Sequence, residues 1–475
     1  MSMEKEQKKT RTECDLLGCV EVPENVLYGV QTMRGLENFP ISKFRLCEYP
    51  LFIRGLAIVK LGAAVANHDM GLLSDELFNA ISQACREIME GKFHEFFPVD
   101  MIQGGAGTTT NMNANEVIAN RALEIMGHAR GEYQYCSPND HVNCSQSTND
   151  AYPSAIHLGL YATHLELRKH LMELIASFAR KGEEFAHVLK MGRTQLQDAV
   201  PMTLGQEFEA YAATLTEEID RLQTNLRLFY EINMGATAIG TGINADPDYA
   251  ELCTKHLREI TGLPLSKATN MIEATSDTGA FIMNSSALKR LAVKLSKICN
   301  DLRLLSSGPR CGLNEINLPP RQPGSSIMPG KVNPVIPEVV NQVAFRVIGN
   351  DLTITLASEA GQLELNVMEP IIVHSLFENI EMLVNAMNTL REKCVVGITA
   401  NPEVCRRMVY NSIGLVTALN PYLGYETSTM LAKEALQTGK GIYDLVLEHR
   451  LMSEEELHKV LLPENMVHPR KKITE

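Results

Sequence analysis

The sequence predicts an all-α protein of three domains, with long helices forming a central bundle between two smaller segments. The prediction rests on the uneven placement of the 21 prolines and on the spacing of apolar residues where prolines are absent. Because proline breaks a helix interior, the proline-free residues 154–200, 202–246 and 265–308 are where long helices are allowed. No stretch shows sustained two-residue alternation, so a core built from a β-sheet is not expected.

Apolar residues in and near these windows recur at steps of three and four, as they do on one face of a helix. Each window allows a helix of roughly 30 to 40 residues, and helices that long must pack side by side. The predicted buried faces are Phe208, Tyr211, Leu215, Ile219, Leu222, Leu226 and Tyr230; Leu288, Leu291, Leu295, Ile298, Leu302 and Leu305; Tyr161, Leu165, Met172, Ile175 and Phe178; and Leu376, Ile380, Leu383, Met387 and Leu390.

The expected domains are a mainly helical N-terminal domain over 1–145, the long-helix bundle over 146–398, and a small helical C-terminal domain over 399–475. A length of 475 residues fits three domains at about 150 residues each. The opening segment MSMEKEQKKTRTECD lacks the apolar core of a signal peptide, which predicts a cytoplasmic chain with a frayed start. No run approaches the roughly 18 uninterrupted apolar residues that a membrane span needs.

Composition restricts the partners of this chain. The net charge of −13 argues against nucleic acid, because phosphate binding requires a basic surface. The 11 cysteines include no CxxC pair, and without a secretion signal they are expected to be reduced, mostly buried thiols. The 13 histidines include no HxxxH or HExxH spacing, so the sequence gives no support for a metal-dependent mechanism.

Residues 309–337 contain a third of the 21 prolines and are predicted to form a loop. A long irregular segment inside a helical domain is more often functional than not. Within it lies GSSIMPGKVNP, from Gly324 to Pro334. A phosphate-binding P-loop fails on spacing, since five residues separate the two glycines where four are needed and Val332 stands where Ser or Thr should hold magnesium. A plain serine- and glycine-rich linker explains an isolated GSS but not the whole string.

The whole string resembles the signature GSSxMPxKxNP of the fumarase/aspartase superfamily. Three further regions match in the same order: GGAGTTTNMNANE around Thr108, STND at 147–150 and GRTQLQD at 192–198. Together with EVPENVLYGVQT near the start and GATAIGTGIN at 235–244, the resemblance covers nearly the entire chain.

The resemblance implies a central bundle of long helices, no organic cofactor, and a homotetramer whose active sites combine regions of three subunits. It also implies reversible elimination of a group from a succinyl skeleton to give fumarate. Two departures from the fumarase pattern favour the aspartase branch, and therefore release of ammonia from L-aspartate: Gln195 replaces the histidine of GRTHLQD, and Ser137 replaces that of HPND. A fumarase, or a non-catalytic structural member of the superfamily, are the alternatives. Retention of the polar motif residues argues against the structural member.

Elimination through an aci-carboxylate intermediate requires several fixed hydrogen-bond donors, because the intermediate carries extra negative charge. By resemblance, Ser325 is the general base, and the substrate-binding residues are Thr108, Ser147, Thr148, Asn149, Thr194, Gln195, Lys331 and Asn333. A serine hydroxyl is a poor base at neutral pH, so its alkoxide is expected to be stabilised by loop amides and by the lysine.

Two polar residues leave alternatives open, and a histidine near the motif residues is assigned a structural role. An amide cannot relay a proton, so Gln195 is expected to donate a hydrogen bond to a carboxylate or contact the amino group, unless it is a neutral replacement for histidine. His141 is predicted to be a structural, hydrogen-bonded histidine. Glu338 either orients a polar neighbour or begins the next helix, where an acidic residue suits the helix dipole.

Overall fold

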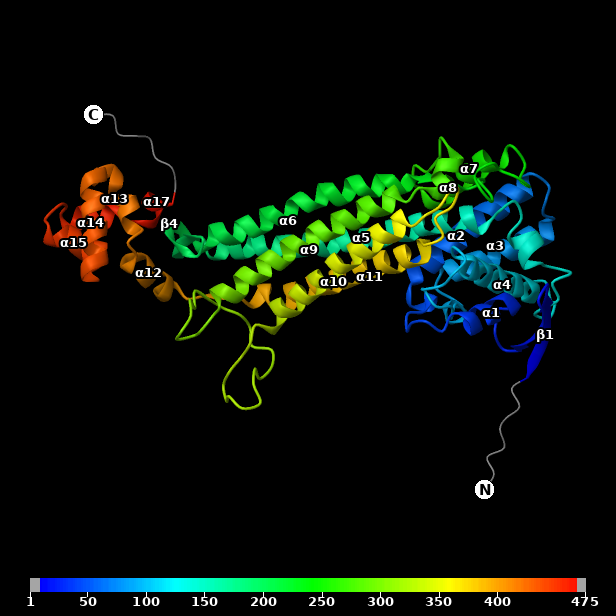
Figure 1. Ribbon diagram of the computed structural model, residues 1–475, viewed down its shortest axis with the longest axis horizontal. Coiled ribbons are helices and arrows are strands. Elements are labelled where there is room, and N and C mark those ends of the chain that lie inside the picture. The colour runs from blue at the N-terminus through cyan, green and yellow to red at the C-terminus, as the bar shows by residue number, and fades with distance from the viewer. Residues whose placement is uncertain (1–8, 468–475) are drawn as a thin grey trace, which may run out of the picture. The chain divides into compact units, whose positions relative to one another are not determined.

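The computed structural model describes residues 9–467, and helices dominate it (Figure 1). The expected frayed start, residues 1–8, lies outside the described part. The α-helices are α1 Val30–Asn38, α2 Pro50–Asp69, α3 Asp75–Met89, α4 Thr108–Ile125, α5 Thr148–Glu184, α6 Leu204–Leu226, α7 Tyr249–Thr261, α8 Met271–Ser276, α9 Gly279–Leu305, α10 Val335–Glu359, α11 Glu369–Lys393, α12 Pro402–Asn411, α13 Leu415–Leu423, α14 Tyr425–Thr438, α15 Ile442–Glu448, α16 Glu454–Val460 and α17 Pro463–Met466.

The strands of the described residues are short and pair only in twos, which confirms the all-α prediction. Three pairs are antiparallel and the pair β5–β6 is parallel. The strands are β1 Thr10–Asp15, β2 Gly18–Pro23, β3 Leu189–Thr194, β4 Gln197–Thr203, β5 Glu231–Ile232, β6 Ser266–Lys267, β7 Ile316–Asn317 and β8 Thr399–Ala400.

The chain forms two compact units. The first contains the chain up to residue 168 together with 220–290 and 346–382, and the second contains 169–219, 291–345 and the chain from residue 383 onward. The long helices α5, α6, α9, α10 and α11 each contribute residues to both units. The three-domain division with boundaries near residues 145 and 398 stays a prediction.

Within each unit, segments of the long helices lie side by side (Figure 1). In the second unit, the Tyr211 hydroxyl donates to Asp301 over 3.2 Å and joins α6 to α9. In the first unit, Asn350 Nδ2 donates to Asn379 Oδ1 over 2.8 Å and joins α10 to α11. These contacts agree with the predicted packing of long helices.

Most of the predicted apolar faces are buried. Every residue predicted for the faces on α9 and α11 is buried, as are most of those on α6. The face predicted for α5 is wrong, because Leu165 and Met172 are exposed. This helix carries apolar residues on more than one face, and the series that it buries is Leu160, Leu167, Leu171, Leu174 and Phe178.

The absence of proline allowed longer helices than the chain forms. The helix α5 has 37 residues, as expected, but α6 has 23 and α9 has 27. Residues 189–203 form the β3–β4 hairpin instead of a helix. The predicted loop also ends early, since α10 begins at Val335 and accommodates Pro337 in its first turn, where the missing N–H has no helical partner to lose.

The expectation that all cysteines are reduced is wrong for one pair. Cys14 and Cys19 form a disulfide with an S–S distance of 2.06 Å. The register of the β1–β2 hairpin places them directly opposite one another, with Cα atoms 4.0 Å apart. The other nine cysteines are free, and most of them are buried.

Among the described residues, α2 is the one helix that is long and apolar enough to cross a membrane. In the structure 72% of its apolar window is buried, and the helix packs against α3, α4 and α7. Core helices of soluble proteins pass the same test of length and composition, and α2 packs as such a core helix.

A buried carboxylate ties α1 to α4. The residue before α1, Gly29, has no side chain to cap the helix. Glu116 of α4 takes this role: its carboxylate accepts the N–H groups of Gly29, Gln31 and Thr32 at 2.7–3.1 Å, and the Thr32 hydroxyl at 2.6 Å. The first N–H groups of a helix need such partners. Burial nevertheless raises the pKa of Glu116 to about 7.

We predict that Glu116→Ala lowers the free energy of unfolding by about 2–3 kcal/mol, because buried N–H groups are left without acceptors. Glu116→Gln keeps one acceptor oxygen and should cost less. Urea unfolding of the three proteins measures the difference. An alanine variant as stable as the wild type would show that this contact does not hold α1.

Candidate functional site

Two helix N-termini meet in the first unit, and they carry four of the predicted substrate-binding residues. Thr108 begins α4, and Ser147, Thr148 and Asn149 span the start of α5. Asn111 Nδ2 donates to Thr148 Oγ1 over 3.1 Å and joins the two helix starts. Unpaired N–H groups and the helix dipole make such positions suited to anions, including carboxylates.

The start of α4 depends on a glycine. Gly107 has a φ of +88°, and a Cβ at this position would lie 2.6 Å from the ring of Tyr152. Only glycine therefore fits this turn. Thr108, the next residue, is exposed, and its hydroxyl donates to the Gly105 carbonyl over 2.7 Å.

The start of α5 is a reciprocal cap. Ser147 Oγ accepts the Asn149 N–H at 3.2 Å, while the Asp150 carboxylate accepts the Ser147 N–H at 2.9 Å. Asp150 is fully buried and also accepts the N–H groups of Gly235 and Thr237. Burial raises the pKa of Asp150 to about 6, which leaves it ionised at neutral pH.

Pro153 lies inside α5 and cannot donate to the carbonyl of Asn149, four residues earlier. Asn233 supplies the missing donor, since its Nδ2 donates to that carbonyl over 2.9 Å. The Asn149 side chain in turn donates to the Ala238 carbonyl over 2.7 Å. Asn149 is thus fixed from both sides by the segment after β5.

A buried polar network lies beneath these residues, and it was not predicted from the sequence. Asn143 Oδ1 accepts from Lys60 Nζ at 3.0 Å, from Asn111 Nδ2 at 3.2 Å and from Asn115 Nδ2 at 3.1 Å. Burial lowers the pKa of Lys60 to about 7, against the opposing effect of Asp150. One feature of the sequence could have indicated this network, namely the single lysine within the apolar run GLAIVKLGAAVA.

Thr194 and Gln195 lie in the second unit, at the tip of the β3–β4 hairpin. Gln195 and Leu196 both have left-handed backbone, with φ of +54° and +61°. Two-residue hairpin turns of this kind usually take Asn or Gly, because left-handed backbone costs other residues roughly 1–2 kcal/mol each. Strain of this kind persists where the surrounding structure fixes it, and it is concentrated at functional sites.

Ser325 also lies in the second unit, in the loop before α10. Its Oγ accepts two backbone N–H groups, from Ile327 at 3.2 Å and from Met328 at 3.0 Å. Two amide donors directed at one hydroxyl oxygen would stabilise negative charge on that oxygen.

The same loop is closed at its base. The Gly324 N–H donates to the Lys331 carbonyl over 2.7 Å, and Asn333 Nδ2 donates to the Gly324 carbonyl over 2.8 Å. A Cβ on Gly324 would lie 2.7 Å from the Lys331 carbonyl, so the closure requires glycine. The Lys331 residue is exposed, whereas the Asn333 amide group is engaged within the loop.

Two other candidates have structural roles. His141 Nδ1 accepts the Ser137 N–H at 2.9 Å, which confirms a hydrogen-bonded structural histidine. Glu338 lies in the first turn of α10, as one of its two predicted roles required.

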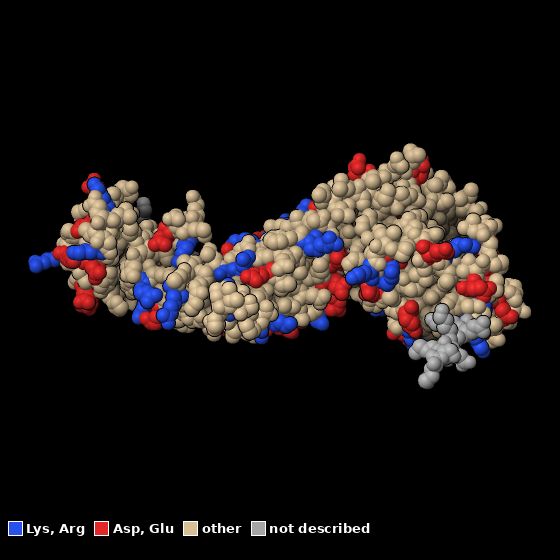
Figure 2. All heavy atoms as spheres, turned by 60° about the horizontal axis from the view of Figure 1, so that its bottom comes forward, with Lys and Arg blue, Asp and Glu red and all other residues tan. Residues whose placement is uncertain are grey.

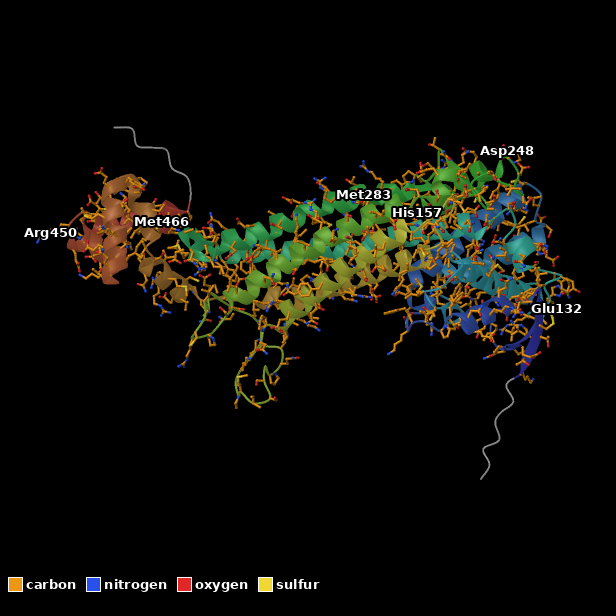
Figure 3. All side chains as sticks on the ribbon, in the orientation of Figure 1. Glu132, His157, Asp248, Met283, Arg450 and Met466 are labelled. Atoms are coloured by element: carbon orange, nitrogen blue, oxygen red, sulfur yellow. A yellow bond between two sulfur atoms is a disulfide. The ribbon has the colours of Figure 1, made fainter. Side chains whose placement is uncertain are left out.

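A cavity in the first unit adjoins this site through Asn233. It is lined by Pro153, His157, Leu228, Glu231, Ile232, Asn233, Glu273, Ala274, Asp277, Ala280, Phe281 and Glu369. Figure 3 labels His157, which lies on α5. Burial lowers the pKa of His157 to about 4 and raises that of Glu369 to about 8. At neutral pH the histidine is neutral and most Glu369 side chains are protonated.

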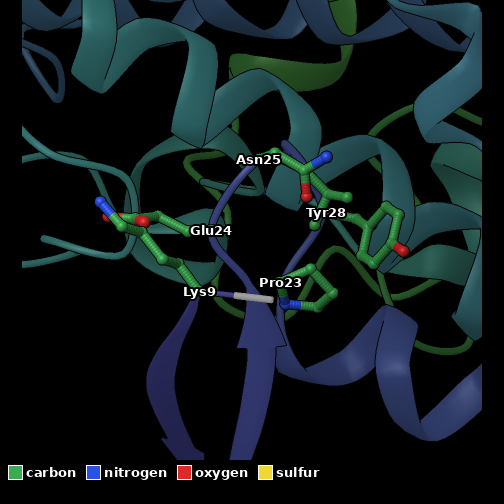
Figure 4. Close-up of a pocket in the computed structure, with 6 residues that line it drawn as sticks. Lys9, Pro23, Glu24, Asn25 and Tyr28 are labelled. Carbon is green, nitrogen blue, oxygen red and sulfur yellow. The ribbon is translucent and has the colours of Figure 1, made fainter. Parts of the chain in front are cut away.

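Neither the cavity beside β2 nor the surface charge offers an alternative to this site. The cavity beside β2 is lined by Pro23, Glu24, Tyr28 and their neighbours, and contains none of the predicted site residues (Figure 4). On the face drawn in Figure 2, basic and acidic side chains are interspersed. An anionic ligand is therefore expected to depend on local donors.

Two family models match the chain: one described as lyase over residues 18–349 and one described as fumarase C C-terminus over residues 415–468. An aspartate ammonia-lyase from Pseudomonas aeruginosa is 63% identical, covering 97% of this chain and 98% of the relative. The aspartate ammonia-lyase from Escherichia coli is 56% identical, covering 97% of this chain and 96% of the relative.

Two solved structures are similar to this chain over nearly its full length. A fumarate lyase:delta crystallin from Brucella melitensis bound to cobalt gives a TM-score of 0.94 at 53% identity, with 97% of this chain and 100% of that chain covered. A class II fumarase from Schistosoma mansoni gives 0.91 at 36% identity, with 98% of this chain and 100% of that chain covered.

The buried Glu369 predicts a pH dependence of stability. In the unfolded chain its pKa returns to the ordinary 4.5, so between pH 4.5 and 8 the folded chain holds a proton that the unfolded chain has released. The free energy of unfolding should therefore fall with rising pH by about 1 kcal/mol per pH unit relative to Glu369→Gln, which lacks the titrating group.

Urea unfolding at pH 5 and pH 8 measures this difference, with the exposed Glu364→Gln as the matched control. The stability difference between wild type and Glu369→Gln should shift by about 3 kcal/mol between these pH values. A constant difference would mean that Glu369 is ionised in the folded chain.

Proposed function

This chain belongs to the lyase family that contains the aspartate ammonia-lyases, and from that membership we propose how its residues release ammonia from L-aspartate. The chain is a carbon–nitrogen lyase that interconverts L-aspartate with fumarate and ammonia. Its substrate is a small dicarboxylate.

The helix starts of the first unit are proposed to bind the substrate carboxylates. Thr108 supplies a hydroxyl at the first turn of α4, and Ser147, Thr148 and Asn149 surround the start of α5. These groups are neutral donors, and two helix dipoles add positive potential at the same place. Such a site binds the two carboxylates of the substrate without requiring a basic surface.

Ser325 is proposed as the general base that removes the proton from C3 of L-aspartate. The observation that carries this assignment is the pair of amide N–H groups directed at its Oγ. An alkoxide in that position is stabilised before the substrate arrives, which makes a serine oxygen a usable base. Electrons from the C3–H bond pass into the neighbouring carboxylate to form the aci-carboxylate, and anti departure of ammonia then gives fumarate.

Lys331 and Asn333 are proposed to stabilise the charge of the aci-carboxylate, with Thr194 and Gln195 on the same wall. A lysine adds a full positive charge where the intermediate gains negative charge. Asn333 must release the Gly324 carbonyl to do so, which links substrate binding to movement of the loop. The strained turn at Gln195 is consistent with a residue held in place for binding.

The assembly is proposed to be a homotetramer whose active sites combine residues from different subunits. Support comes from an exposed apolar row on α10, where four residues at steps of three and four share one face. Phe345, Ile348, Leu352 and Leu356 are 63%, 39%, 61% and 60% exposed in the single chain. Apolar rows of this kind mark protein interfaces.

We place the enzyme in the cytoplasm as part of the same proposal.

The function and the base are tested together by the absorbance of fumarate formed from L-aspartate. Ser325→Ala should lower turnover by at least about 10³-fold while leaving substrate affinity largely intact, because it removes the base and no carboxylate donor. The matched control is Ser326→Ala, since the neighbouring hydroxyl accepts no amide N–H among the described residues; it should lose less than about tenfold.

Two outcomes would contradict these assignments. Near-wild-type turnover by Ser325→Ala would remove Ser325 from the mechanism. Hydration of fumarate to malate without any release of ammonia from L-aspartate would replace the proposed reaction with that of a fumarase.

The assembly is tested by sedimentation equilibrium, which should give a mass near four times the 52.7 kDa of one chain. Leu352→Glu should yield smaller, inactive species, because assembly would bury its charge. A wild-type mass of one chain, with full activity, would contradict shared active sites.

A further inference from the structure

A buried ion cluster lies in the second unit under the turn that carries Thr194 and Gln195. The Glu315 side chain is fully buried, and its carboxylate contacts Lys190 Nζ at 3.2 Å and Arg193 Nη2 at 2.8 Å. Lys190 also pairs with Glu207 of α6. Two cations and two anions balance, and the cluster is neutral.

The backbone of Glu315 is fixed at both ends. Its N–H donates to the Leu305 carbonyl at the end of α9 over 2.9 Å, and its carbonyl accepts the Asn401 N–H, just before α12, at 2.9 Å. The carboxylate is therefore attached to a backbone position that is held in place. Side chains attached to such fixed elements position their partners well, whereas side chains on free loops do not.

Arg193, which contacts this carboxylate, lies beside an irregularity of the β3–β4 hairpin. The β3–β4 register shifts between Met191 and Arg193, because two residues of β4, at 199 and 200, lie opposite the single residue Gly192. A Cβ on Gly192 would lie 2.8 Å from the Val200 carbonyl, so the bulge requires glycine. A bulge bends the strand pair and increases its local twist, and Arg193, directly before Thr194, is the first paired residue of β3 beyond it.

The turn itself has left-handed backbone at two non-glycine residues, Gln195 and Leu196, and it needs an external anchor to persist. On one strand the anchor is the contact of Arg193 with Glu315. On the other strand, Asp198 accepts the Ser412 hydroxyl at 2.7 Å. The contact of Arg193 with Glu315 is an electrostatic attraction between opposite charges, because neither Glu315 oxygen has a well-directed hydrogen bond among the described residues.

We propose that Glu315 is a positioning residue for the reaction: its buried carboxylate holds Arg193, and through it Thr194 and Gln195, in the geometry that receives the substrate. This inference rests on the proposed role of the turn in binding L-aspartate. Displacing a binding group by about 1 Å can cost 10²-fold in rate, so an indirect anchor has a measurable effect.

The test compares Glu315→Gln with Glu207→Gln in the full-length protein. Both variants remove one negative charge from the same cluster and from the surroundings of Lys190, but of the two glutamates it is Glu315 whose ion pair with Arg193 the described residues show. We expect Glu315→Gln to lower kcat/KM for L-aspartate about 10²-fold, measured well below its Tm, and Glu207→Gln to stay within about threefold of wild type.

Amide hydrogen exchange over residues 189–203, measured without substrate, reports on the anchor directly. Exchange at this hairpin should be at least about tenfold faster in Glu315→Gln and near wild type in Glu207→Gln. If Glu315→Gln yields no folded protein, Glu315→Asp keeps the charge and shortens the side chain, and should change both readouts in the same direction by less.

Unchanged exchange at the hairpin, or equal loss of activity in the two variants, would overturn the proposal, because either result leaves Glu315 with only a general role in stability. Faster exchange with unchanged kcat/KM would likewise reject a positioning role in the reaction. If the wild type forms no fumarate from L-aspartate, the proposed function fails instead, and the exchange experiment still decides whether Glu315 holds the turn.

Discussion

The amide oxygen of Asn143 is the point on which the site of the first unit depends. It accepts from three donors on two helices, Lys60 of α2 and Asn111 and Asn115 of α4. Hydrogen bonds are strong in a dry interior, and these three converge on one oxygen. The buried amide oxygens of Asn111 and Asn115 have no hydrogen-bond partner among the described residues, so their donor groups alone orient these side chains. Asn111 extends it to Thr148, and this is how the starts of α4 and α5 come together.

With the proposed site residues, this arrangement accounts for the binding of a dicarboxylate substrate by a chain whose net charge is −13. The proposed carboxylate donors are hydroxyls and backbone N–H groups at helix starts, which carry partial positive charge without basic side chains. The charged groups near these helix starts are buried in the interior of the first unit. Asp150 caps α5, and Lys60, whose pKa is near neutrality, donates to the network around Asn143. The second unit uses the same principle, since amide N–H groups surround the oxygen of Ser325.

Local patterns predicted much of this protein, and long-range contacts account for what they missed. Proline placement and three-to-four spacing located the long helices, and the proline cluster at 309–337 located the loop that carries Ser325, because each pattern lies within one stretch of sequence. The spacing failed on α5, where several faces are apolar and Leu165 was assigned to the wrong one. It could not reveal that Glu116 caps α1 or that Asn233 serves the Asn149 carbonyl, since those partners are separated by more than 80 residues.

The central claim is that the starts of α4 and α5 hold the substrate carboxylates while Ser325 takes the proton. A crystal structure of the Ser325→Ala variant with bound L-aspartate tests it most directly, because substrate binding should survive the loss of the base. The account predicts a carboxylate oxygen within about 3 Å of the Thr108 hydroxyl and another within the same distance of donors at Ser147 or Thr148. L-Aspartate bound away from both helix starts would contradict it.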